Sequence, residues 1–322
     1  MTTVEDVLGI VDVSEVKDVS ESDKWLIPGV VSTQNTLLFG TADVGKSLAV
    51  CGLLASLVDG REFLGITPLR SGLRPLIICA DRGAELEYKE RLSHLGIEEN
   101  IKLMPGAGVM EQTTWDLLHY YAATNDIGVV VIDHATGTID GDEKERLPWV
   151  QFWKERVEPF NLPVIVVAHS SDWVGQNGVS HRVQGNSASK QFARAQVEVC
   201  RTDLNQWDSP KRMLRSSGRY GGHTEKRFTI VDPGVICHDA VAEESATQKR
   251  SGETLDGNRH IAELAAASKA VTVKAVAEDI AERAGLSVST LERQKLPRLV
   301  RMGLLEKTSG EGSGLYKLAN SM

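Results

Sequence analysis

The chain has 322 residues, of which 41% are hydrophobic and 25% are charged, and its formal net charge is -8. This length allows one large domain and a small second one, and the composition is that of an ordinary globular protein. The negative balance argues against a protein that coats nucleic acid with its whole surface, but it is compatible with a local basic surface.

Four cysteines are scattered along the chain without a CxxC pair, at positions 51, 79, 200 and 237. This spacing predicts neither a zinc site nor a disulfide framework, and reduced cytoplasmic thiols are the simplest interpretation. The N-terminal sequence MTTVEDVLGIVDV is acidic, unlike a signal peptide. The longest apolar runs, such as GVVVI, have the length of a strand, so we expect a cytoplasmic protein without a membrane partner.

Residues 1–23 are polar and acidic, and we expect them to form a separate N-terminal segment. From residue 24 to about 240, short apolar runs alternate with helical patterns, which predicts an α/β fold with a mainly parallel sheet and crossover helices. Several runs are apolar on both faces, as strands between two helical layers are. The predicted strands are residues 37–39, 76–80, 129–133, 164–168 and 197–200, with further edge strands near 213–215 and 228–231.

The run TLLFGTADVGKSLAV holds the pattern G-x-x-x-x-G-K-S between an apolar strand and a helical run. Gly40 and Gly45 let backbone N–H groups face phosphates, and the following helix adds its positive N-terminal end. In this motif Lys46 reaches the β and γ phosphates and Ser47 ligates Mg²⁺. The alternative, a glycine-rich turn before a core helix, leaves the lysine unexplained. The predicted nucleotide-binding residues are Gly40, Thr41, Ala42, Asp43, Val44, Gly45, Lys46, Ser47 and Leu48.

Two carboxylates stand at predicted strand ends. Asp133 ends the run VVVID and can hold the water shell of Mg²⁺ beside Ser47, although a strand-end aspartate also caps helices. Asp81 follows PLIICA and is the first candidate for orienting or deprotonating an attacking water, with Glu85 as the second. The alternative for Asp81 is a helix N-cap.

His169 and Ser170 follow the run PVIVVA, at the end of another predicted strand. A polar side chain there can contact the γ phosphate and report its loss. The alternative is a hydrogen-bonded histidine at the edge of the sheet.

The stretch KWLIPGVVSTQNTLLFGTADVGKS resembles the opening of RepA-like ATPases, which are RecA-type hexameric helicases of plasmid and phage replication related to the DnaB-type core. The resemblance continues through LIICADRGAELEYKERLSHLGI, VVVIDHATG, VIVVAHSSD and VQGNSASKQFARAQVEVCR, and covers about residues 24–231. It implies a RecA-like P-loop fold with ATP and Mg²⁺ as ligands. By the same resemblance Lys46 and Ser47 bind phosphate and Mg²⁺, and Asp133 is the Walker B acid.

Three positions depart from the family pattern. Asp81 stands where the family has a catalytic glutamate, which is one methylene longer. The sequence AHSS replaces a double histidine and leaves His169 alone. Ala42 and Asp43 replace a proline and a glycine, and Asp43 brings a negative charge near the phosphates.

The segment MLRSSGRYGGHTEKRFTIV resembles the late strands of RecA-like motors, in which a basic residue reaches the γ phosphate of the next subunit. Arg219 is the best match and Arg215 the second. An arginine donated in trans ties hydrolysis to assembly of a homo-oligomer, a hexamer in this family. The alternative is a solvated arginine on a loop.

Residues 241–257 contain no aromatic and little aliphatic side chain, and are interpreted as a linker. Residues 258–322 then show three helical patterns and two short strands around a glycine- and serine-rich tip, the order of elements in a winged helix. Gly285 suits a helix end, and Ser287 or Ser289 suits the next cap. Pro297 is expected to kink the third helix or to begin a new first turn.

The C-terminal region carries ten Lys/Arg and seven Asp/Glu, a net charge of +3, which leaves -11 on the rest of the chain. A positive module on an acidic body fits DNA binding, although winged helices also mediate protein contacts. The candidate DNA-binding residues are Arg293, Lys295, Arg298, Arg301 and Lys307, with Lys317 near the wing.

These features together predict an ATP-driven, DNA-associated ring motor of the RepA-like class, acting in replication or recombination of a phage, plasmid or integrated element. Single-stranded DNA would pass through the ring and duplex DNA would bind the winged helix. A second interpretation is a DNA-binding regulatory or loader ATPase, in which the nucleotide state switches assembly and no DNA is unwound. A third is a nucleotide-binding scaffold with degraded catalysis.

Overall fold

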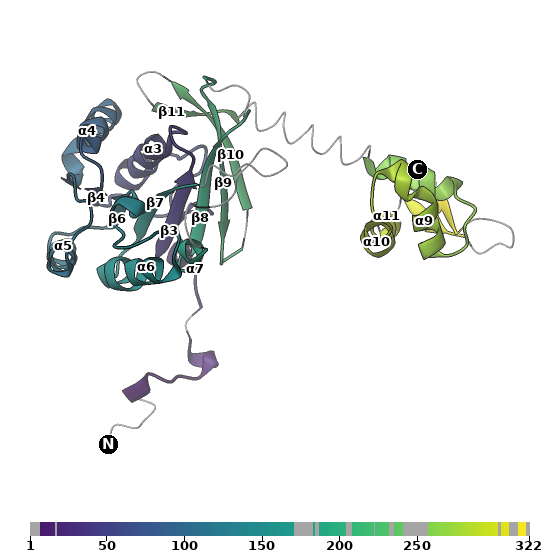
Figure 1. Ribbon diagram of the computed structural model, residues 1–322, viewed down its shortest axis with the longest axis horizontal. Helices are drawn as coiled ribbons and strands as arrows, with labels where there is room; N and C mark the ends of the chain where they lie inside the picture. The colour runs from purple at the N-terminus through teal and green to yellow at the C-terminus, as the bar shows by residue number, and fades with distance from the viewer. Residues whose placement is uncertain are drawn as a thin grey trace. The chain divides into compact units, whose positions relative to one another are not determined.

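The computed structural model describes residues 7–16, 18–170, 183, 187–203, 208–221, 223–231, 235–240, 257–301, 304–308 and 315–319. The chain divides into two compact units, Met1–Ala240 and Val241–Met322, each with its own core (Figure 1). Within the described ranges, no helix combines the length and the hydrophobicity that a bilayer crossing requires.

The first unit is built on a nine-stranded sheet with the order β11-β10-β9-β8-β3-β7-β6-β4-β5. β3 lies in its middle and pairs in parallel with both neighbours, whereas β8 to β11 pair antiparallel. The central place of β3 sets the loop that follows it among the ends of the parallel strands. The strands are β3 (Asn35–Gly40), β4 (Pro75–Cys79), β5 (Lys102–Met104), β6 (Val129–Asp133), β7 (Val164–His169), β8 (Ala195–Arg201), β9 (Lys211–Gly218), β10 (His223–Val231) and β11 (Val235–His238).

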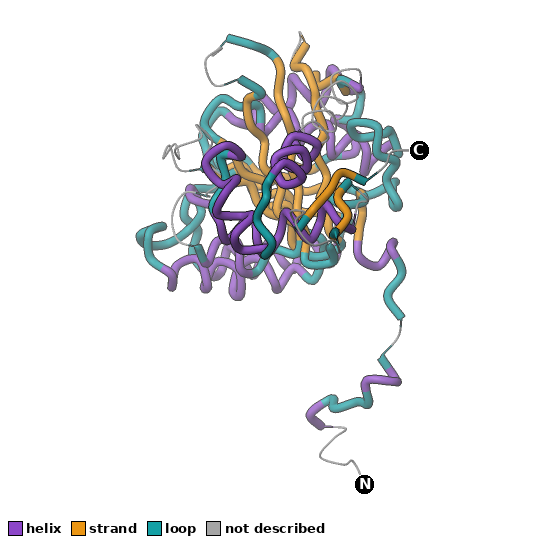
Figure 2. The backbone as a smooth tube through the Cα atoms, turned by 90° about the vertical axis from the view of Figure 1, so that its right-hand side faces the viewer, coloured by secondary structure: helices purple, strands orange, loops and turns teal. Residues whose placement is uncertain are grey.

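Helices cover both faces of this sheet, because alternate residues of its strands are apolar on opposite sides. Along β6, Val129 and Val131 enter the core with one helical layer, while Val130 and Ile132 enter the core with the other. Figure 2 shows the strands of this sheet in orange among purple helices. One layer holds α3 (Lys46–Asp59) and α4 (Ala84–Leu95); the other holds α5 (Gln112–Thr124), α6 (Arg146–Gln151), η4 (Phe152–Val157) and α7 (Ala188–Gln191).

The predicted α/β class and the mainly parallel sheet are confirmed, including antiparallel strands at one edge. The sequence pattern missed β5, β11 and the small separate sheet of β1 (Trp25–Ile27) and β2 (Val31–Ser32). All four of these strands have two to four residues, too few to show an alternating pattern.

The second unit contains a helix over residues 257–267, then α9 (Val273–Ala284), then a helical stretch from Val288 to Arg301, and finally the antiparallel pair β12 (Leu305–Lys307) and β13 (Tyr316–Leu318). Gly285 ends α9 with a φ of 63°, and the Ser287 hydroxyl accepts from the N–H of Thr290 at 3.2 Å. Pro297 lies in the first turn of α11 (Leu296–Arg301). Most of the predicted linker and the tip between the two strands fall outside the described residues.

Candidate functional site

The loop between β3 and α3 has the backbone that its glycines require. Gly45 precedes α3 with a φ of 94°, which side chains other than hydrogen disfavour. At Gly40 a Cβ atom would overlap the carbonyl oxygen of Val199 on the neighbouring strand. Gly45 is therefore required by the backbone conformation, and Gly40 is required by the lack of space for a side chain. α3 starts directly after Gly45, with the N–H groups of its first turn facing the loop.

Lys46 begins α3 and folds back over the loop. Its side chain is buried, its Nζ donates to the Thr41 carbonyl at 2.8 Å, and the same atom lies 3.3 Å from Nδ1 of His169. Burial lowers the pKa of Lys46, and the nearby charges of Asp133 and Asp43 oppose this shift. The ammonium is thus held where the phosphate-binding motif needs it.

The ring of His169 is neutral at neutral pH. Burial, together with the positive charge of Lys46 and the nearby His134, lowers its pKa to about 4, and the carboxylates of Asp133 and Asp81 oppose this shift. A neutral ring can accept the Lys46 proton at Nδ1 while Nε2 carries its own proton. The rings of His169 and His134 meet edge to face, with centroids 4.8 Å apart. A second imidazole therefore does stand beside His169, but it comes from the end of β6 rather than from the next position in the chain.

Asp133 accepts two hydrogen bonds on one carboxylate oxygen. Its Oδ2 is 2.9 Å from Oγ of Ser47 and 2.6 Å from the hydroxyl of Tyr88. A serine hydroxyl and a carboxylate in contact are the hard oxygen donors that Mg²⁺ prefers. The residues present therefore fit a Mg²⁺ ion accompanying a nucleotide.

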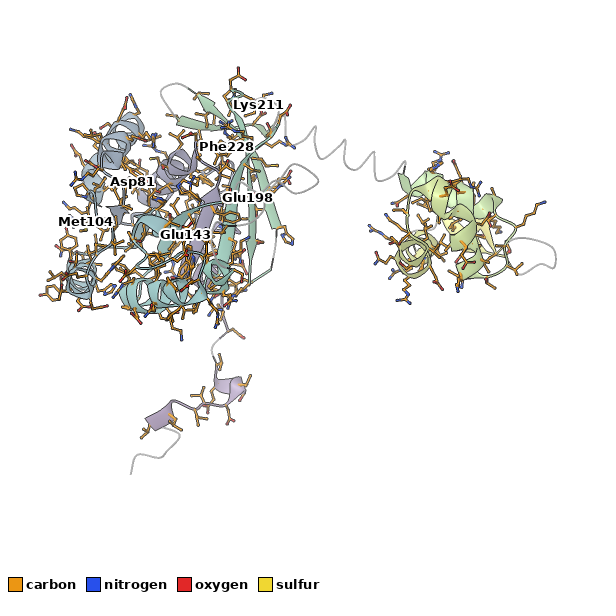
Figure 3. All side chains as sticks on the ribbon, in the orientation of Figure 1. Asp81, Met104, Glu143, Glu198, Lys211 and Phe228 are labelled. Atoms are coloured by element: carbon orange, nitrogen blue, oxygen red, sulfur yellow. The ribbon has the colours of Figure 1, made fainter. Side chains whose placement is uncertain are left out.

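Asp81, labelled in Figure 3, lies just beyond β4. The neighbouring strand in the sheet is β6, which ends at Asp133 opposite Cys79 of β4. Its carboxylate is 70% exposed, lines the same pocket and lies 3.7 Å from Nδ1 of His134. The N-cap of α4 is Gly83, so Asp81 does not cap that helix. Glu85 instead accepts from the N–H of Gly83 at 2.9 Å, which occupies its carboxylate at the helix start.

These side chains surround a pocket of about 350 Å³. Four of its lining residues, Glu87, Arg91, His134 and Ile230, were not predicted from the sequence, and neither was Tyr88, which contacts Asp133. His134 adjoins Asp133 in the sequence and could have been named from that. Tyr88 and Arg91 lie one turn apart on α4, and only the packing of that helix brings them to the site. The pocket is lined by Asp43, Gly45, Lys46, Ser47, Leu48, Asp81, Glu87, Arg91, Asp133, His134, His169 and Ile230.

The antiparallel edge of the sheet also supports the loop. The buried Arg212 of β9 donates from Nε to the carbonyl of Val44 at 3.0 Å. Ile230 of β10 lies against Gly45, where a Cβ would come within 2.9 Å of its Cδ1. Asp43, in contrast, is exposed and has a φ of 53°, a conformation that glycine adopts more readily than aspartate.

Arg219 lies far from the loop of its own chain. It follows β9, donates to the carbonyl of Gln191, and lines a second pocket of about 440 Å³ with Asn35, the first residue of β3. The phosphate loop follows the last residue of the same strand, so the two sites are at opposite ends of β3. Arg215 pairs with Glu225 at 3.4 Å.

The candidate DNA-binding residues of the second unit lie on its last helical stretch and its hairpin. Arg293, Arg298 and Arg301 are exposed, whereas Leu291, Leu296 and Leu299 on the opposite side are buried. Lys295 is half-buried, Lys307 is exposed on β12, and Lys317 is paired with Glu306 at 3.0 Å. The helix thus presents three cations on one face and its apolar residues to the core.

Comparison with solved structures shows a similar fold at low sequence identity. A DnaB-like replicative helicase, solved in a study of its interactions with primase, matches with a TM-score of 0.50 and 12% identity over 71% of this chain and 64% of that chain. This chain therefore spans less than two thirds of that helicase. The ATPase domain of the protein named G40P matches with a TM-score of 0.49 and 13% identity over 62% and 82% of the two chains. A KaiC-like protein from Pyrococcus horikoshii OT3 matches with a TM-score of 0.43 and 13% identity, over 69% of this chain and 99% of that chain.

No curated protein sequence is significantly similar to this chain. The DnaB-like comparison agrees with a RecA-like P-loop architecture for the sheet and the helices of the first unit. Residues 4–172 match the model of a family described as AAA domain. That match spans more than half of the chain and includes the phosphate loop, Asp81, Asp133 and His169. The chain therefore belongs to the AAA domain family, and it is a P-loop ATPase, as the resemblance to RepA-like ATPases predicts.

Proposed function

We propose that this protein is an ATP-hydrolysing, DNA-associated motor of the RepA-like class, acting in replication or recombination of a phage, plasmid or integrated element. The observation that carries the proposal is the convergence of Lys46, Ser47 and Asp133 within hydrogen-bonding distance of their neighbours around one pocket. This set binds a nucleoside triphosphate, because it joins backbone N–H donors, a buried ammonium and hard oxygen ligands.

The side chains divide the work of hydrolysis. Lys46 neutralises phosphate oxygens, and Ser47 with Asp133 would hold a Mg²⁺ ion, which would stabilise charge on the phosphates when bound. Asp81 is the group that orients the attacking water, because its exposed carboxylate faces the pocket from the neighbouring strand. Neutral His169 contacts the Lys46 ammonium and is placed to respond to the γ phosphate.

Hydrolysis in this proposal needs an assembled homo-oligomer, for which we propose a hexamer. Arg219 lies at the opposite end of β3 from the phosphate loop and so is remote from its own pocket. We therefore propose that Arg219 reaches the nucleotide of a neighbouring subunit and stabilises charge on its γ phosphate. The ring would surround single-stranded DNA.

The second unit is proposed to be a winged helix that binds duplex DNA. Its order of helices and hairpin and the exposed cations Arg293, Arg298 and Arg301 support this role. Lys295 and Lys307 are further candidates for phosphate contacts.

The alternative is a regulatory or loader ATPase whose state is switched by the bound nucleotide and which does not unwind DNA. It is favoured by Asp81, whose carboxylate is one methylene shorter than the glutamate expected there and lies 3.7 Å from Nδ1 of His134. A short, exposed carboxylate slows hydrolysis more than it weakens binding.

Hydrolysis of ATP by the wild type and by Lys46→Ala, with and without single-stranded DNA, tests the proposal when combined with a strand-displacement assay. We expect DNA to stimulate hydrolysis by the wild type and expect displacement of the paired strand. Stimulated hydrolysis without displacement would exclude the helicase and favour the switch. Binding of ATP without any hydrolysis would instead support a nucleotide-binding scaffold with degraded catalysis.

A further inference from the structure

Tyr88 is a buried polar side chain with one evident partner. It lies in α4, its side chain is 1% exposed, and it packs in the same apolar core as Leu92 and Cys79. A phenol hydroxyl in such surroundings needs a hydrogen-bond partner, because an unsatisfied polar group is costly to bury. The partner is Oδ2 of Asp133, at 2.6 Å.

The phenol acts as a donor in this contact. A phenol carries a proton at neutral pH, whereas an ionised carboxylate can only accept, so the hydrogen bond runs from Tyr88 to Asp133. Short hydrogen bonds from a hydroxyl to a carboxylate are among the stronger ones in proteins. The bond therefore restrains the rotation of the Asp133 carboxylate.

Ser47 donates to the same oxygen at 2.9 Å. Two donors use both lone-pair directions of Oδ2. Within the described part of the chain no hydrogen bond to Oδ1 is observed, so this oxygen keeps its lone pairs for a cation or its bound water.

The position of Tyr88 along the chain gives this contact a further consequence. Tyr88 stands on the helix that follows Asp81, and Asp133 ends the strand beside β4, with Cys79 opposite Asp133 in the pairing. The bond from Tyr88 to Asp133 therefore fixes α4 and the turn that carries Asp81 against the end of β6.

We propose that Tyr88 is a positioning residue, whose hydroxyl orients the Asp133 carboxylate for the divalent cation that accompanies the nucleotide. This role rests on the proposed function of the pocket. It differs from a role in core packing, because phenylalanine fills the same space and lacks the donor.

The test compares the affinity of the full chain for a fluorescent ATP analogue in Mg²⁺ and in EDTA. In Tyr88→Phe we expect the gain in affinity that Mg²⁺ provides to fall by about tenfold, because the variant lacks a hydrogen bond to a charged group. The affinity in EDTA should stay at the wild-type value. Tyr120→Phe is the matched control, since Tyr120 is 69% exposed on α5.

An equal Mg²⁺ gain in Tyr88→Phe and the wild type would overturn the role of Tyr88 alone. Failure of the wild type to bind in either condition would overturn the nucleotide site and this role with it. If Tyr88→Phe does not fold, the wild-type chain labelled with 3-fluorotyrosine tests the same role by fluorine NMR. The fluorine resonance of residue 88, assigned by exclusion with phenylalanine variants of the other tyrosines, should move when Mg²⁺ joins the bound nucleotide; an unmoved resonance would overturn the proposal.

Discussion

Nζ of Lys46 lies 3.3 Å from Nδ1 of His169, so the phosphate-binding lysine is hydrogen-bonded to a ring at the end of the adjacent parallel strand. The contact requires a neutral imidazole, because a protonated ring has no acceptor and would repel the ammonium. The nucleotide pocket is therefore sensitive to the protonation of one histidine.

The first prediction concerns stability against pH. The pKa of His169 is about 4 in the folded chain, below its ordinary value of 6.5, so the unfolded chain binds a proton first as the pH falls. His169 should make the free energy of unfolding decrease as the pH falls from 6.5 to about 4, with no further change from this group below that range. Urea denaturation of His169→Gln should show a smaller decrease across this window. His94→Gln, at an exposed position on α4, controls for the substitution; equal slopes in all three proteins would contradict the assignment.

The second prediction concerns Asp43, which brings a negative charge and a φ of 53° to the phosphate loop. Asp43→Asn removes the charge and keeps a side chain that tolerates this conformation, and Asp43→Gly removes both the charge and the strain. Both variants should bind the triphosphate about two- to fivefold more tightly, because a like charge near the ligand is removed. Isothermal titration measures this. Tighter binding by the glycine variant alone would show that the backbone strain, and not the charge, weakens binding. Weaker binding by both variants would refute the prediction.

The third prediction concerns the action of Arg219 on the nucleotide of a neighbouring subunit. Arg219→Ala should bind nucleotide normally and lose hydrolysis by roughly a thousandfold, the range seen for arginine fingers. Mixing it with Lys46→Ala should restore part of the activity, because mixed assemblies then contain sites with Lys46 from one subunit and Arg219 from the next. Arg215→Ala is the comparison variant, since Arg215 pairs with Glu225. A mixture as inactive as its components would show that Arg219 does not act across subunits.

The fourth prediction concerns the C-terminal unit. Truncation after Ala240 should weaken duplex DNA binding and spare nucleotide binding, because the first unit has its own core. Within the full chain, Arg293→Ala with Arg298→Ala should reduce the dependence of binding on salt, by about 0.9 in log-log slope for each DNA phosphate that the protein no longer neutralises. Both arginines are exposed, so the fold should persist. Duplex binding that keeps its strength and its salt dependence after truncation would place the DNA site elsewhere.

The sequence was sufficient for those parts of the site that depend on neighbours in the chain. Gly40 to Ser47 are contiguous, and the parallel strands that end at Asp133 and His169 necessarily bring their ends to one edge of the sheet. It was not sufficient for contacts set by packing between distant segments. Tyr88 meets Asp133 across 45 positions, and Arg212 meets Val44 across 168. A tyrosine in a charged helix and an arginine in an edge strand have no local pattern that indicates these partners.

Equilibrium binding of Mg²⁺·ATP to the full chain and to Lys46→Ala tests the central claim most directly. The account predicts saturable binding by the wild type and at least about a hundredfold weaker binding by Lys46→Ala, since alanine cannot make the buried, charge-assisted hydrogen bond to phosphate. Both proteins should unfold at similar temperatures without nucleotide. Equal affinity in the two proteins, or no binding by the folded wild type, would contradict the assignment of this loop as the phosphate site.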